Sequence, residues 1–527
     1  MKRPPGGLGI VLHAHLPFVR HPEQQSFLEE DWLHHAITEC YAPLLDTFER
    51  LAADGVPFGV TMSLSPTLCA MLGDDLLRAR FSERLEHLMA LANRAAGALA
   101  PHYAERLGRV RDVWHAHQGD LLAGFARIES QGHLDLWAVP ATHAVLPLLP
   151  TSESRRAQIR IGIESHRRHF AKTPRGMWLP ECAWDETLDA TLAECGVRNV
   201  VLEAHALAGA WPRPRHGLAA PIRTPAGIAA FGRDPESSVR VWSASEGYPG
   251  DPAYREFHRD VGWDADQETV EPFLSDDGHR RPVGLKLHRV TGPVPLSGKS
   301  SYDPEAANRR AVEHARDFLG GRARLLRRLG QRMDRSPIVV AAFDAELFGH
   351  WWYEGPVFLD ALFRLAARSP AIETISLSDH VDAHGPDEQS SPAPSTWGKG
   401  ADLRTWLHEG TAWMLDPAHQ AEARMLRLAA RPPAGALGRR ALAQAGRELL
   451  LSQSSDWAFL ITAGPSRSYA EHRFREHIAA FSNLCDAIEY SHIDEPHLAS
   501  LESRNNLFPW LDPESWTSAA PQPDCCS

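Results

Sequence analysis

The chain has 527 residues, 43% of them hydrophobic and 23% charged, which is typical of a globular protein. Its net charge of -12 argues against non-specific binding to nucleic acid or to an anionic membrane. No apolar run reaches the roughly 20 residues of a membrane-spanning helix, and the run 8–12 is too short for a secretory signal. The seven cysteines show no pairing pattern and fit free thiols. We therefore expect a cytoplasmic protein with neither nucleic acid nor a membrane as partner.

Short apolar runs rich in valine, isoleucine and leucine recur in the first 380 residues, and each has the length of a β-strand. In chain order they span residues 9–12, 58–62, 134–139, 197–202 and 337–343. Helical patterns lie between them, for example over residues 82–92 and 306–329. Alternating strands and helices predict a parallel sheet, open or closed into a barrel. The chain is long enough for one large barrel and an accessory domain.

A segment rich in proline, serine, aspartate and glutamine, residues 385–395, predicts a linker or a long loop. Beyond it, helical patterns cover residues 417–430, 435–453 and 469–490. We therefore predict a catalytic domain over residues 1–390 and a C-terminal helical domain over residues 391–527. An arginine-rich helical stretch near residues 74–118 reads as an insertion in the first domain.

Two carboxylates stand next to aromatic residues. Glu181 follows Trp178-Leu179-Pro180, and Asp344 ends the apolar run 337–343. A carboxylate in apolar surroundings is costly unless it is paired or used, and the carboxyl ends of barrel strands are where barrel enzymes build their sites. Paired carboxylates with aromatic rings for stacking on sugars indicate a glycosidase. A structural ion pair for Glu181 and a helix N-cap for Asp344 are the alternatives.

His13-Ala14-His15 places two imidazoles on one face of the first strand, because side chains in a strand alternate with period two. One interpretation is a polar cleft lined by histidines. The other is a metal-dependent hydrolase, in which His13 and His15 hold a divalent ion with ligands from later strands. His143, His205 and Asp344 would be the further ligands in that case.

Taken together, these residues resemble glycoside hydrolase family 57 and, within it, the α-1,4-glucan branching enzymes. The segments that carry the resemblance are His13-Ala14-His15-Leu16-Pro17, Ala141-Thr142-His143, Trp178-Leu179-Pro180-Glu181, Phe231-Gly232-Arg233-Asp234, residues 344–355 and Ser455-Asp456-Trp457. The resemblance covers nearly the whole chain. It implies an incomplete (β/α)7 barrel with a helical insertion and a C-terminal helical domain. It also implies a retaining mechanism that uses no metal and no other cofactor.

The resemblance also implies roles for individual residues. Glu181 would be the nucleophile that forms a glycosyl-enzyme, and Asp344 the general acid and base. The other residues that would contact the α-glucan are His13, His15 and His143 beside the bond that is cut, Arg233 and Asp456 as polar contacts, and Trp178, Trp351, Trp397, Trp406 and Trp457 as stacking or cleft-wall residues. The oligomeric state is left open.

Branching and hydrolysis differ only in whether a glucan hydroxyl or water attacks the intermediate, so a branching enzyme must exclude water. The family's branching enzymes resemble this chain but carry a longer loop with a tyrosine where this chain has only residues 208–217. A tryptophan of the family is His288 here, and another expected aromatic residue is Gln25. We therefore expect a branching enzyme, with a mainly hydrolytic α-amylase-type enzyme as the alternative.

Overall fold

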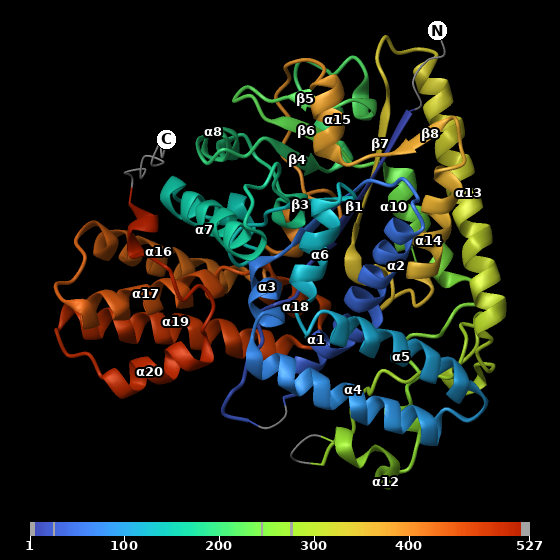
Figure 1. The fold of residues 1–527 in the computed structure, drawn as a ribbon. Helices are drawn as coiled ribbons and strands as arrows, with labels where there is room; N and C mark the ends of the chain where they lie inside the picture. Colours follow the sequence, from blue (N-terminus) through green and yellow to red (C-terminus); the bar gives the residue numbers. More distant parts are fainter. Residues whose placement is uncertain (1–5, 25–26, 244–245, 275–277, 518–527) are drawn as a thin grey trace.

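The computed structural model describes residues 6–24, 27–243, 246–274 and 278–517 (Figure 1). Gln25 lies outside these ranges. Parallel strands form the centre of the fold, in the order β3-β2-β1-β7 in one sheet and with β4 beside β6 in another. Their bounds are β1 (Gly6–Ala14), β2 (Val60–Leu64), β3 (Leu134–Trp137), β4 (Asn199–Leu202), β6 (Ala229–Gly232) and β7 (Ile338–Asp344). Two short strands flank them: β5 (Ile222–Arg223) is antiparallel to β6, and β8 (Ile372–Thr374) is parallel to β1.

Single parallel bridges join the two sheets into a barrel. Met177 pairs with Ala138, just after β3, and with Val200 in β4. On the other side, Arg233 follows β6 and pairs with Val340 in β7. The six parallel strands and the Met177 position thus follow one another round a closed ring. This arrangement confirms the predicted incomplete (β/α)7 barrel and adds two ring positions, Met177 and β6, that the apolar runs did not reveal.

The predicted strands are present, and their residues are buried on both faces, as expected for a parallel sheet covered by helices. Every residue of β1 is buried, and so is every residue of β7 before Asp344. Covering helices include α2 (Ala42–Ala53), α6 (Leu121–Ser130), α7 (Ser152–Phe170), α13 (Pro304–Gly330), α14 (Gly355–Ala366) and α15 (Leu377–His384). The shorter helices are α1 (Glu30–Ala36), α3 (Pro66–Leu72), α8 (Thr187–Glu194), α9 (Ala204–Ala208), α10 (Pro235–Trp242), α11 (Val261–Asp264) and α12 (Gln267–Val270).

The predicted helical insertion is present as α4 (Asp75–Ala95) and α5 (Ala100–Ala116), which pack against each other. The side chain of Asp74 caps α4 by accepting a hydrogen bond from Leu77 N. Apolar side chains on one face of each helix, such as Leu85 and Leu107, are buried. None of the helices in the described part of the chain is long and apolar enough to cross a membrane.

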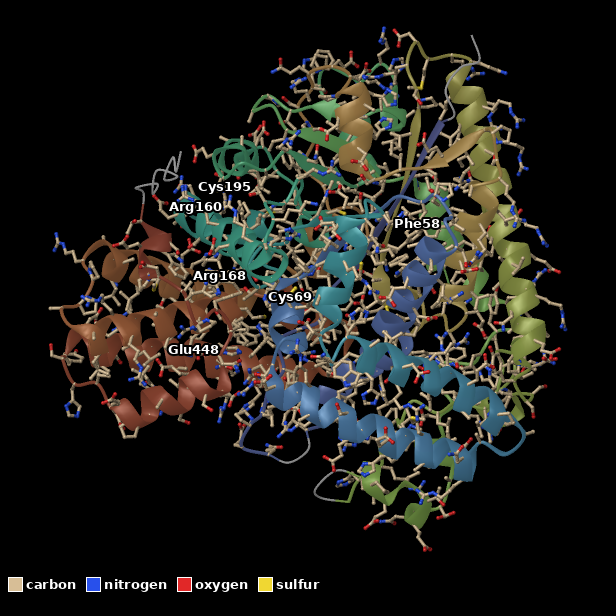
Figure 2. All side chains as sticks on the ribbon, viewed as in Figure 1. Phe58, Cys69, Arg160, Arg168, Cys195 and Glu448 are labelled. Atoms are coloured by element: carbon tan, nitrogen blue, oxygen red, sulfur yellow. The ribbon has the colours of Figure 1, made fainter. Side chains whose placement is uncertain are left out.

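The C-terminal region is helical, as predicted. Its helices are α16 (Leu415–Ala430), α17 (Ala436–Ser452), α18 (Ser455–Ala463), α19 (Arg467–Glu489) and α20 (Glu495–Arg504). Glu448 is buried among them, where it accepts hydrogen bonds from His477 Nδ1 at 2.7 Å and Asn505 Nδ2 at 2.8 Å (Figure 2). Buried residues of α17 and of β1 belong to one apolar cluster, so the two regions share a core. The boundary at residues 390 and 391 stays a prediction.

Residues 385–395 are an ordered connection rather than a free linker. Ser391 exchanges main-chain hydrogen bonds of 2.9 and 3.0 Å with Trp211. Gln389 and Ser395 form bridges with Arg223 and Trp184. The connection therefore runs along β5, Trp211 and Trp184 and brings the chain back to the barrel. Composition did not predict this, because backbone pairing with distant segments leaves no local pattern.

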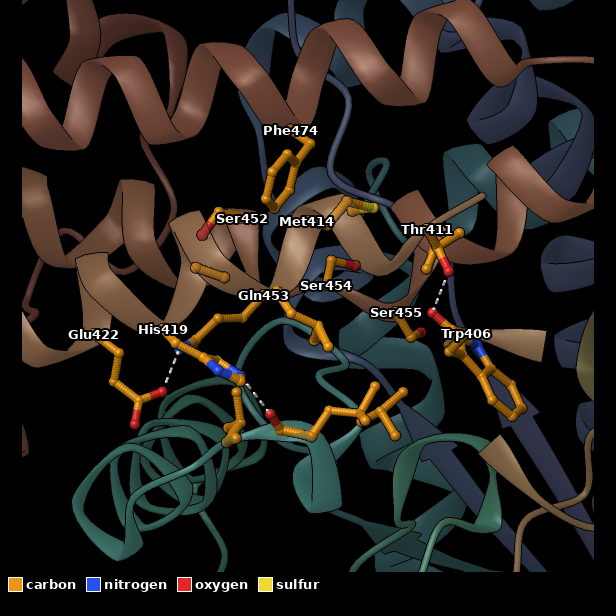
Figure 3. A pocket seen from close by; sticks show the side chains of 16 residues that line it. Trp406, Thr411, Met414, His419, Glu422, Ser452, Gln453, Ser454, Ser455 and Phe474 are labelled. Atoms are coloured by element: carbon orange, nitrogen blue, oxygen red, sulfur yellow. Dashed lines mark hydrogen bonds between the residues drawn. The ribbon is translucent and has the colours of Figure 1, made fainter. Parts of the chain in front are cut away.

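A small, largely apolar cavity of about 70 Å³ lies between the barrel and the C-terminal helices (Figure 3). Val145, Trp406, Phe474, Ser454 and Ser455 are among the residues that line it. These two serines begin α18, so the cavity lies directly behind the segment that reaches the barrel mouth.

Candidate active site

The carboxyl ends of the barrel strands bring the predicted residues together. His13 of β1 is in register with Ser63 of β2 on one side and with Asp344 of β7 on the other. Glu181 lies just beyond the Met177 ring position, so it reaches the same end of the barrel. The charge of Asp344 acts on Glu181, as expected for two carboxylates in one site.

Glu181 sits in the short 3-10 turn Pro180–Cys182 with a left-handed backbone, φ 63°. Its neighbour Cys182 and the distant His143 also have positive φ values, 50° and 60°. Non-glycine residues adopt this conformation at a cost of roughly 1–3 kcal/mol, and such residues cluster at functional sites. The turn aims the Glu181 side chain into the barrel mouth instead of along the strand.

Two donors hold the carboxylate of Glu181. Its Oε2 accepts a hydrogen bond from Trp397 Nε1 at 2.7 Å, and its Oε1 accepts one from Ser455 Oγ at 2.9 Å. The main chain is tied as well, because Trp397 N donates to Glu181 O at 2.9 Å. Both donors belong to the C-terminal part of the chain, so this region completes the site.

Asp344 has a different environment. It is the N-cap residue of a short 3-10 helix, but its side chain makes no capping bond, and it has no hydrogen-bond partner within the described residues. The N-cap alternative is therefore excluded, and the carboxyl group is left available for a bound molecule. Arg233 is the cation that lowers the pKa of Asp344 most; its guanidinium is held by Glu203 at 2.7 Å and lies 4.9 Å above the Trp397 ring.

Burial raises the pKa of both carboxyl groups. The pKa of Glu181 rises to about 7, because desolvation and the charge of Asp344 outweigh the hydrogen bonds from Trp397 and Ser455. The pKa of Asp344 rises to about 6 through desolvation, although Arg233 and His15 oppose the rise. Coupled groups titrate as a pair, so near pH 6–7 the two carboxyl groups share one proton, and the higher pKa of Glu181 places that proton mainly on Glu181. A nucleophilic Glu181 with Asp344 as proton donor requires the opposite distribution.

A third carboxyl group, Glu346, was not predicted. It is buried, it accepts a hydrogen bond from His15 N at 3.1 Å, and it accepts another from the hydroxyl of Tyr41. Desolvation and the charge of Asp344 raise its pKa to about 7. Its position two residues after Asp344 is the feature of the sequence that could have indicated it as a site residue. Glu346 ties the end of β1 to the turn that follows Asp344.

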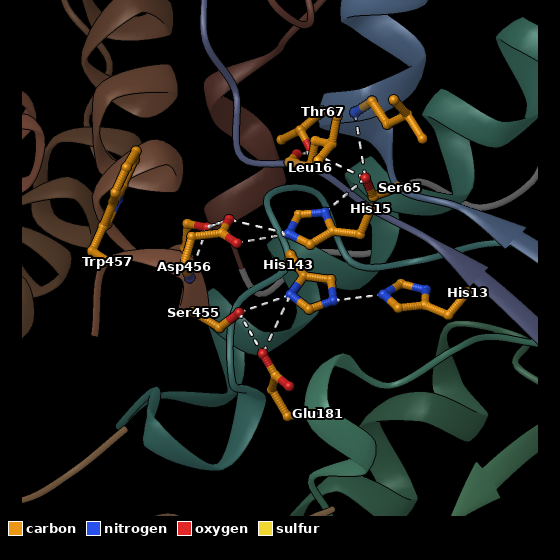
Figure 4. Close-up of polar contacts among 12 residues, drawn as sticks. His13, His15, Leu16, Ser65, Thr67, His143, Glu181, Ser455, Asp456 and Trp457 are labelled. Atoms are coloured by element: carbon orange, nitrogen blue, oxygen red, sulfur yellow. Dashed lines mark hydrogen bonds and ion pairs between the residues drawn. The ribbon is translucent and has the colours of Figure 1, made fainter. Parts of the chain in front are cut away.

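His15 forms an ion pair with Asp456 (Figure 4). Its Nε2 lies 3.0 Å from Asp456 Oδ1, and its Nδ1 lies 2.8 Å from Ser65 Oγ. Burial lowers the pKa of His15, but the Asp456 carboxylate outweighs this and the net pKa is raised. The His15 ring stacks on His143 with centroids 3.7 Å apart. Both side chains of the pair remain slightly exposed, at 11% and 13%, so a ligand can reach them.

His13 and His143 are buried, with only 2% and 3% of their surfaces exposed. His13 bonds Ser63 and His143, and His143 bonds Ser455, so all four ring nitrogens contact protein atoms. Direct hydrogen bonds to a sugar were expected from both residues. In the structure their ring nitrogens are occupied by protein partners, and the expected contacts to a sugar stay a prediction.

The tryptophans divide into two groups. Trp397 touches Glu181, and Trp178 is buried between His13 and Trp397, at centroid distances of 4.8 and 5.1 Å. Trp351 is 53% exposed and stacks on Phe257 at 4.4 Å, so its free face is available.

For Trp406 and Trp457, the expectation was either that they stack on substrate and line the cleft or that they seal the interface between the two regions. Trp406 is 4% exposed and packs against Val145 and Ala183. Trp457 is fully buried and donates a hydrogen bond to Leu451 O at 2.7 Å. Their rings are covered by protein, so packing between the two regions is the role that this structure supports for them.

In the ranges that the structure describes, no group of three or more histidine, cysteine, aspartate or glutamate side chains is arranged to hold a metal ion. His13, His15 and His143 lie close together, but their ring nitrogens are hydrogen-bonded to serines, to each other and to Asp456. The ligand set expected for the metal-dependent alternative is therefore not assembled there.

Known proteins resemble the chain in sequence. The family model of glycosyl hydrolase family 57 matches residues 9–264, and that of the C-terminal domain of 1,4-alpha-glucan branching enzyme matches residues 417–516. The 1,4-alpha-glucan branching enzyme TK1436 of Thermococcus kodakarensis is 32% identical over 95% of this chain and 77% of its own length.

Solved structures resemble it as well. The alpha-amylase AmyC of Thermotoga maritima has a TM-score of 0.91 and 39% identity over 98% of this chain and 100% of its own. The branching enzyme of Pyrococcus horikoshii has a TM-score of 0.88 and 31% identity, and 98% of each chain is covered. Sequence and structure agree over both the barrel and the C-terminal helices, and the chain belongs to glycosyl hydrolase family 57.

Proposed function

We propose that this protein is a retaining α-1,4-glucan branching enzyme in which Glu181 is the nucleophile and Asp344 the general acid and base. The observation that carries the proposal is the contrast between the two carboxyl groups: Glu181 is fixed by two donors, whereas Asp344 makes no hydrogen bond within the described residues. A nucleophile needs a fixed direction, and a proton carrier needs a free oxygen. The branching-enzyme names of TK1436 and the Pyrococcus horikoshii protein support the same reaction.

The reaction has two steps. In the first, Glu181 attacks the anomeric carbon of an α-1,4-linked glucose, the glycosidic bond breaks, and Asp344 gives its proton to the departing 4-oxygen. In the second, Asp344 takes the proton of a 6-hydroxyl group on an acceptor glucan. That oxygen attacks the anomeric carbon, the bond to Glu181 breaks, and an α-1,6 branch with the original configuration forms.

The surrounding side chains fit an uncharged, polyhydroxylated substrate. The His15–Asp456 pair and Arg233 offer charged hydrogen-bonding groups at the mouth, each partly exposed. Trp351 offers an exposed ring for stacking on a glucose unit. We assign the glucan contacts to these residues and a supporting role to His13 and His143.

Hydrolysis by the same site is the second candidate. It is favoured by the short segment 208–217, which has no tyrosine and is pinned to Ser391 through Trp211. The name alpha-amylase of the similar AmyC protein points the same way. Branching remains the first proposal, because the C-terminal model and the TK1436 relative both carry that name.

The cytoplasm is the proposed setting, with glycogen-like chains as substrate. Cys40, Cys69, Cys182, Cys195 and Cys485 are free thiols, which suits a reducing compartment.

Incubation with amylose distinguishes the two candidates. New α-1,6 linkages and new reducing ends are measured in the same samples. Linkages well in excess of reducing ends support branching, and an excess of reducing ends means that hydrolysis dominates. Retention of the anomeric configuration is measured by NMR on the first product. A chelator should leave the activity unchanged, and dependence on a metal would overturn the assignment of Glu181 and Asp344.

A further inference from the structure

A continuous line of hydrogen bonds runs from Ser63 to Glu181. Figure 4 shows its part from His13 through His143 and Ser455 to Glu181. Ser63 Oγ lies 2.8 Å from His13 Nδ1, and His13 Nε2 lies 2.9 Å from His143 Nε2. His143 Nδ1 lies 2.8 Å from Ser455 Oγ, which donates to Glu181 Oε1 at 2.9 Å. The line links β2, β1, the segment after β3 and the first residue of α18. We call these four supporting residues the relay.

The positions of the hydrogen atoms follow from the last bond. Ser455 has one hydroxyl proton, and an ionised Glu181 can only accept. Ser455 therefore accepts from His143, whose proton must be on Nδ1. His143 Nε2 is then an acceptor, so His13 carries its proton on Nε2, and its Nδ1 accepts from Ser63. Every donor in the relay points toward Glu181.

We propose that the relay is a positioning device for the nucleophile, in which Ser455 and a neutral, Nδ1-protonated His143 fix the Glu181 carboxylate and stabilise its negative charge. This inference rests on the proposed function, in which ionised Glu181 attacks the sugar. Aligned hydrogen bonds polarise one another in a low-dielectric interior, so the effect of the last bond exceeds that of an isolated serine.

The local structure holds the relay rigidly. Ser455 N donates to His143 O at 3.1 Å, and Ala144 forms a bridge with Ser454, so the two ends of the His143–Ser455 bond are fixed by backbone. The positive φ of His143 turns its ring toward Ser455. Burial lowers the pKa of His13 and His143 well below the usual value, and neighbouring histidines add to this, so both rings are neutral as the relay requires.

The relay acts among other charges that face Glu181. The titratable groups that interact with it are His15, His143, Cys182, Asp344 and Asp456, and the charge of Arg233 acts on Cys182 and Asp344. A donor to an ionised carboxylate lowers its pKa. Removal of the Ser455 hydroxyl therefore raises the pKa of Glu181, and the acid limb of the kcat/KM profile moves to higher pH because less of the nucleophile is ionised.

The first test compares Ser455→Ala, Ser455→Thr and the control Ser452→Ala. Ser452 is also buried in this region, but it donates only to Leu449 O. Ser455→Ala should lower kcat about tenfold and shift the acid limb upward by about one pH unit. Ser455→Thr keeps the hydroxyl, and the cavity of Figure 3 lies beside this position and offers space for the added methyl group. The acid limb of kcat/KM in this variant should therefore return toward that of the wild type. An unshifted limb in Ser455→Ala overturns the proposal.

The second test needs no variant and no turnover. Nitrogen-15 NMR of the histidine rings in the wild-type protein at pH 8, where Glu181 is ionised, should show Nδ1–H for His143 and Nε2–H for His13. Nε2–H on His143, or a charged His143 ring, contradicts the relay.

Glu181→Gln separates the two proposals. Activity in that variant rejects Glu181 as nucleophile. An inactive Glu181→Gln together with an unshifted acid limb in Ser455→Ala rejects only the relay.

Discussion

The indole Nε1 of Trp397 donates a 2.7 Å hydrogen bond to the carboxylate of Glu181, from a position 216 residues further along the chain. Trp397 follows the connection that runs back across the barrel, and its main chain is also bonded to Glu181. The second donor, Ser455, begins the helix α18. The nucleophile is therefore oriented from the C-terminal side, and the barrel by itself lacks both groups that fix it.

Removal of either carboxylate should abolish turnover. Glu181→Gln prevents the glycosyl-enzyme from forming, and Asp344→Asn removes the proton donor. We expect each to lower kcat/KM by at least about 1,000-fold. Initial rates on amylose provide the measurement. Exposed Glu186 gives the control Glu186→Gln, which should keep full activity. Turnover close to wild type in either catalytic variant contradicts the assignment.

Trp397→Phe keeps an aromatic ring beside Trp178 but removes the donor to Glu181. That hydrogen bond lowers the pKa of Glu181, so its loss should move the acid limb of kcat/KM to higher pH and reduce kcat about tenfold. The pH profile from pH 5 to 8 is the measurement. A normal profile with a raised KM would mean that Trp397 only contacts substrate.

The raised pKa of Glu181 also predicts how stability depends on pH. Folded Glu181, with a pKa of about 7, binds its proton more tightly than the unfolded chain does, at its ordinary 4.5. The contribution of the protonated Glu181 to the free energy of unfolding is thus fully present below pH 4.5 and is lost as the pH rises through 7. Glu181→Gln should flatten this decline by on the order of 2–3 kcal/mol between pH 5 and 8. The free energy of unfolding is measured with denaturant at pH 5 and at pH 8. If it falls by the same amount in the wild type and in Glu181→Gln, the raised pKa of Glu181 is rejected.

Two tryptophans should respond in opposite ways. Trp351 is half exposed, so Trp351→Ala should raise KM for amylose several-fold and leave the melting temperature unchanged. Trp457 is fully buried, so Trp457→Ala should destabilise the protein by about 3–5 kcal/mol. Melting curves and KM values for both variants check this. A raised KM with normal stability in Trp457→Ala would show that Trp457 contacts the substrate.

The His15–Asp456 pair gives a further prediction. Asp456 raises the pKa of His15, so Asp456→Asn should lower it and leave the imidazole neutral near pH 7. Loss of a charge-assisted contact to the glucan should lower kcat/KM by roughly 10- to 100-fold. Histidine titration by NMR together with steady-state kinetics provides the check. An unchanged His15 titration would show that the two groups do not interact in solution.

The sequence by itself determined the five strands β1, β2, β3, β4 and β7, several of the longer helices and the two catalytic candidates. Parallel strands buried on both faces need continuous apolar runs, so β1 and β7 are visible as residues 9–12 and 337–343. Asp344 ends such a run and therefore had to lie at the carboxyl end of the sheet. The motifs around Glu181 and Asp344 carried the family resemblance, and the family followed from them.

Tertiary structure decided the rest. The Met177 ring position is held by single bridges and has no apolar run of its own, so nothing in its local sequence showed a strand. The same motifs that named His13, His143 and Trp457 could not tell a side chain facing the mouth from one packed behind it, because burial depends on which distant segments cover a residue. The bonds from Trp397 and Ser455 to Glu181 join positions 216 and 274 residues apart, and only the folded chain brings those atoms within reach.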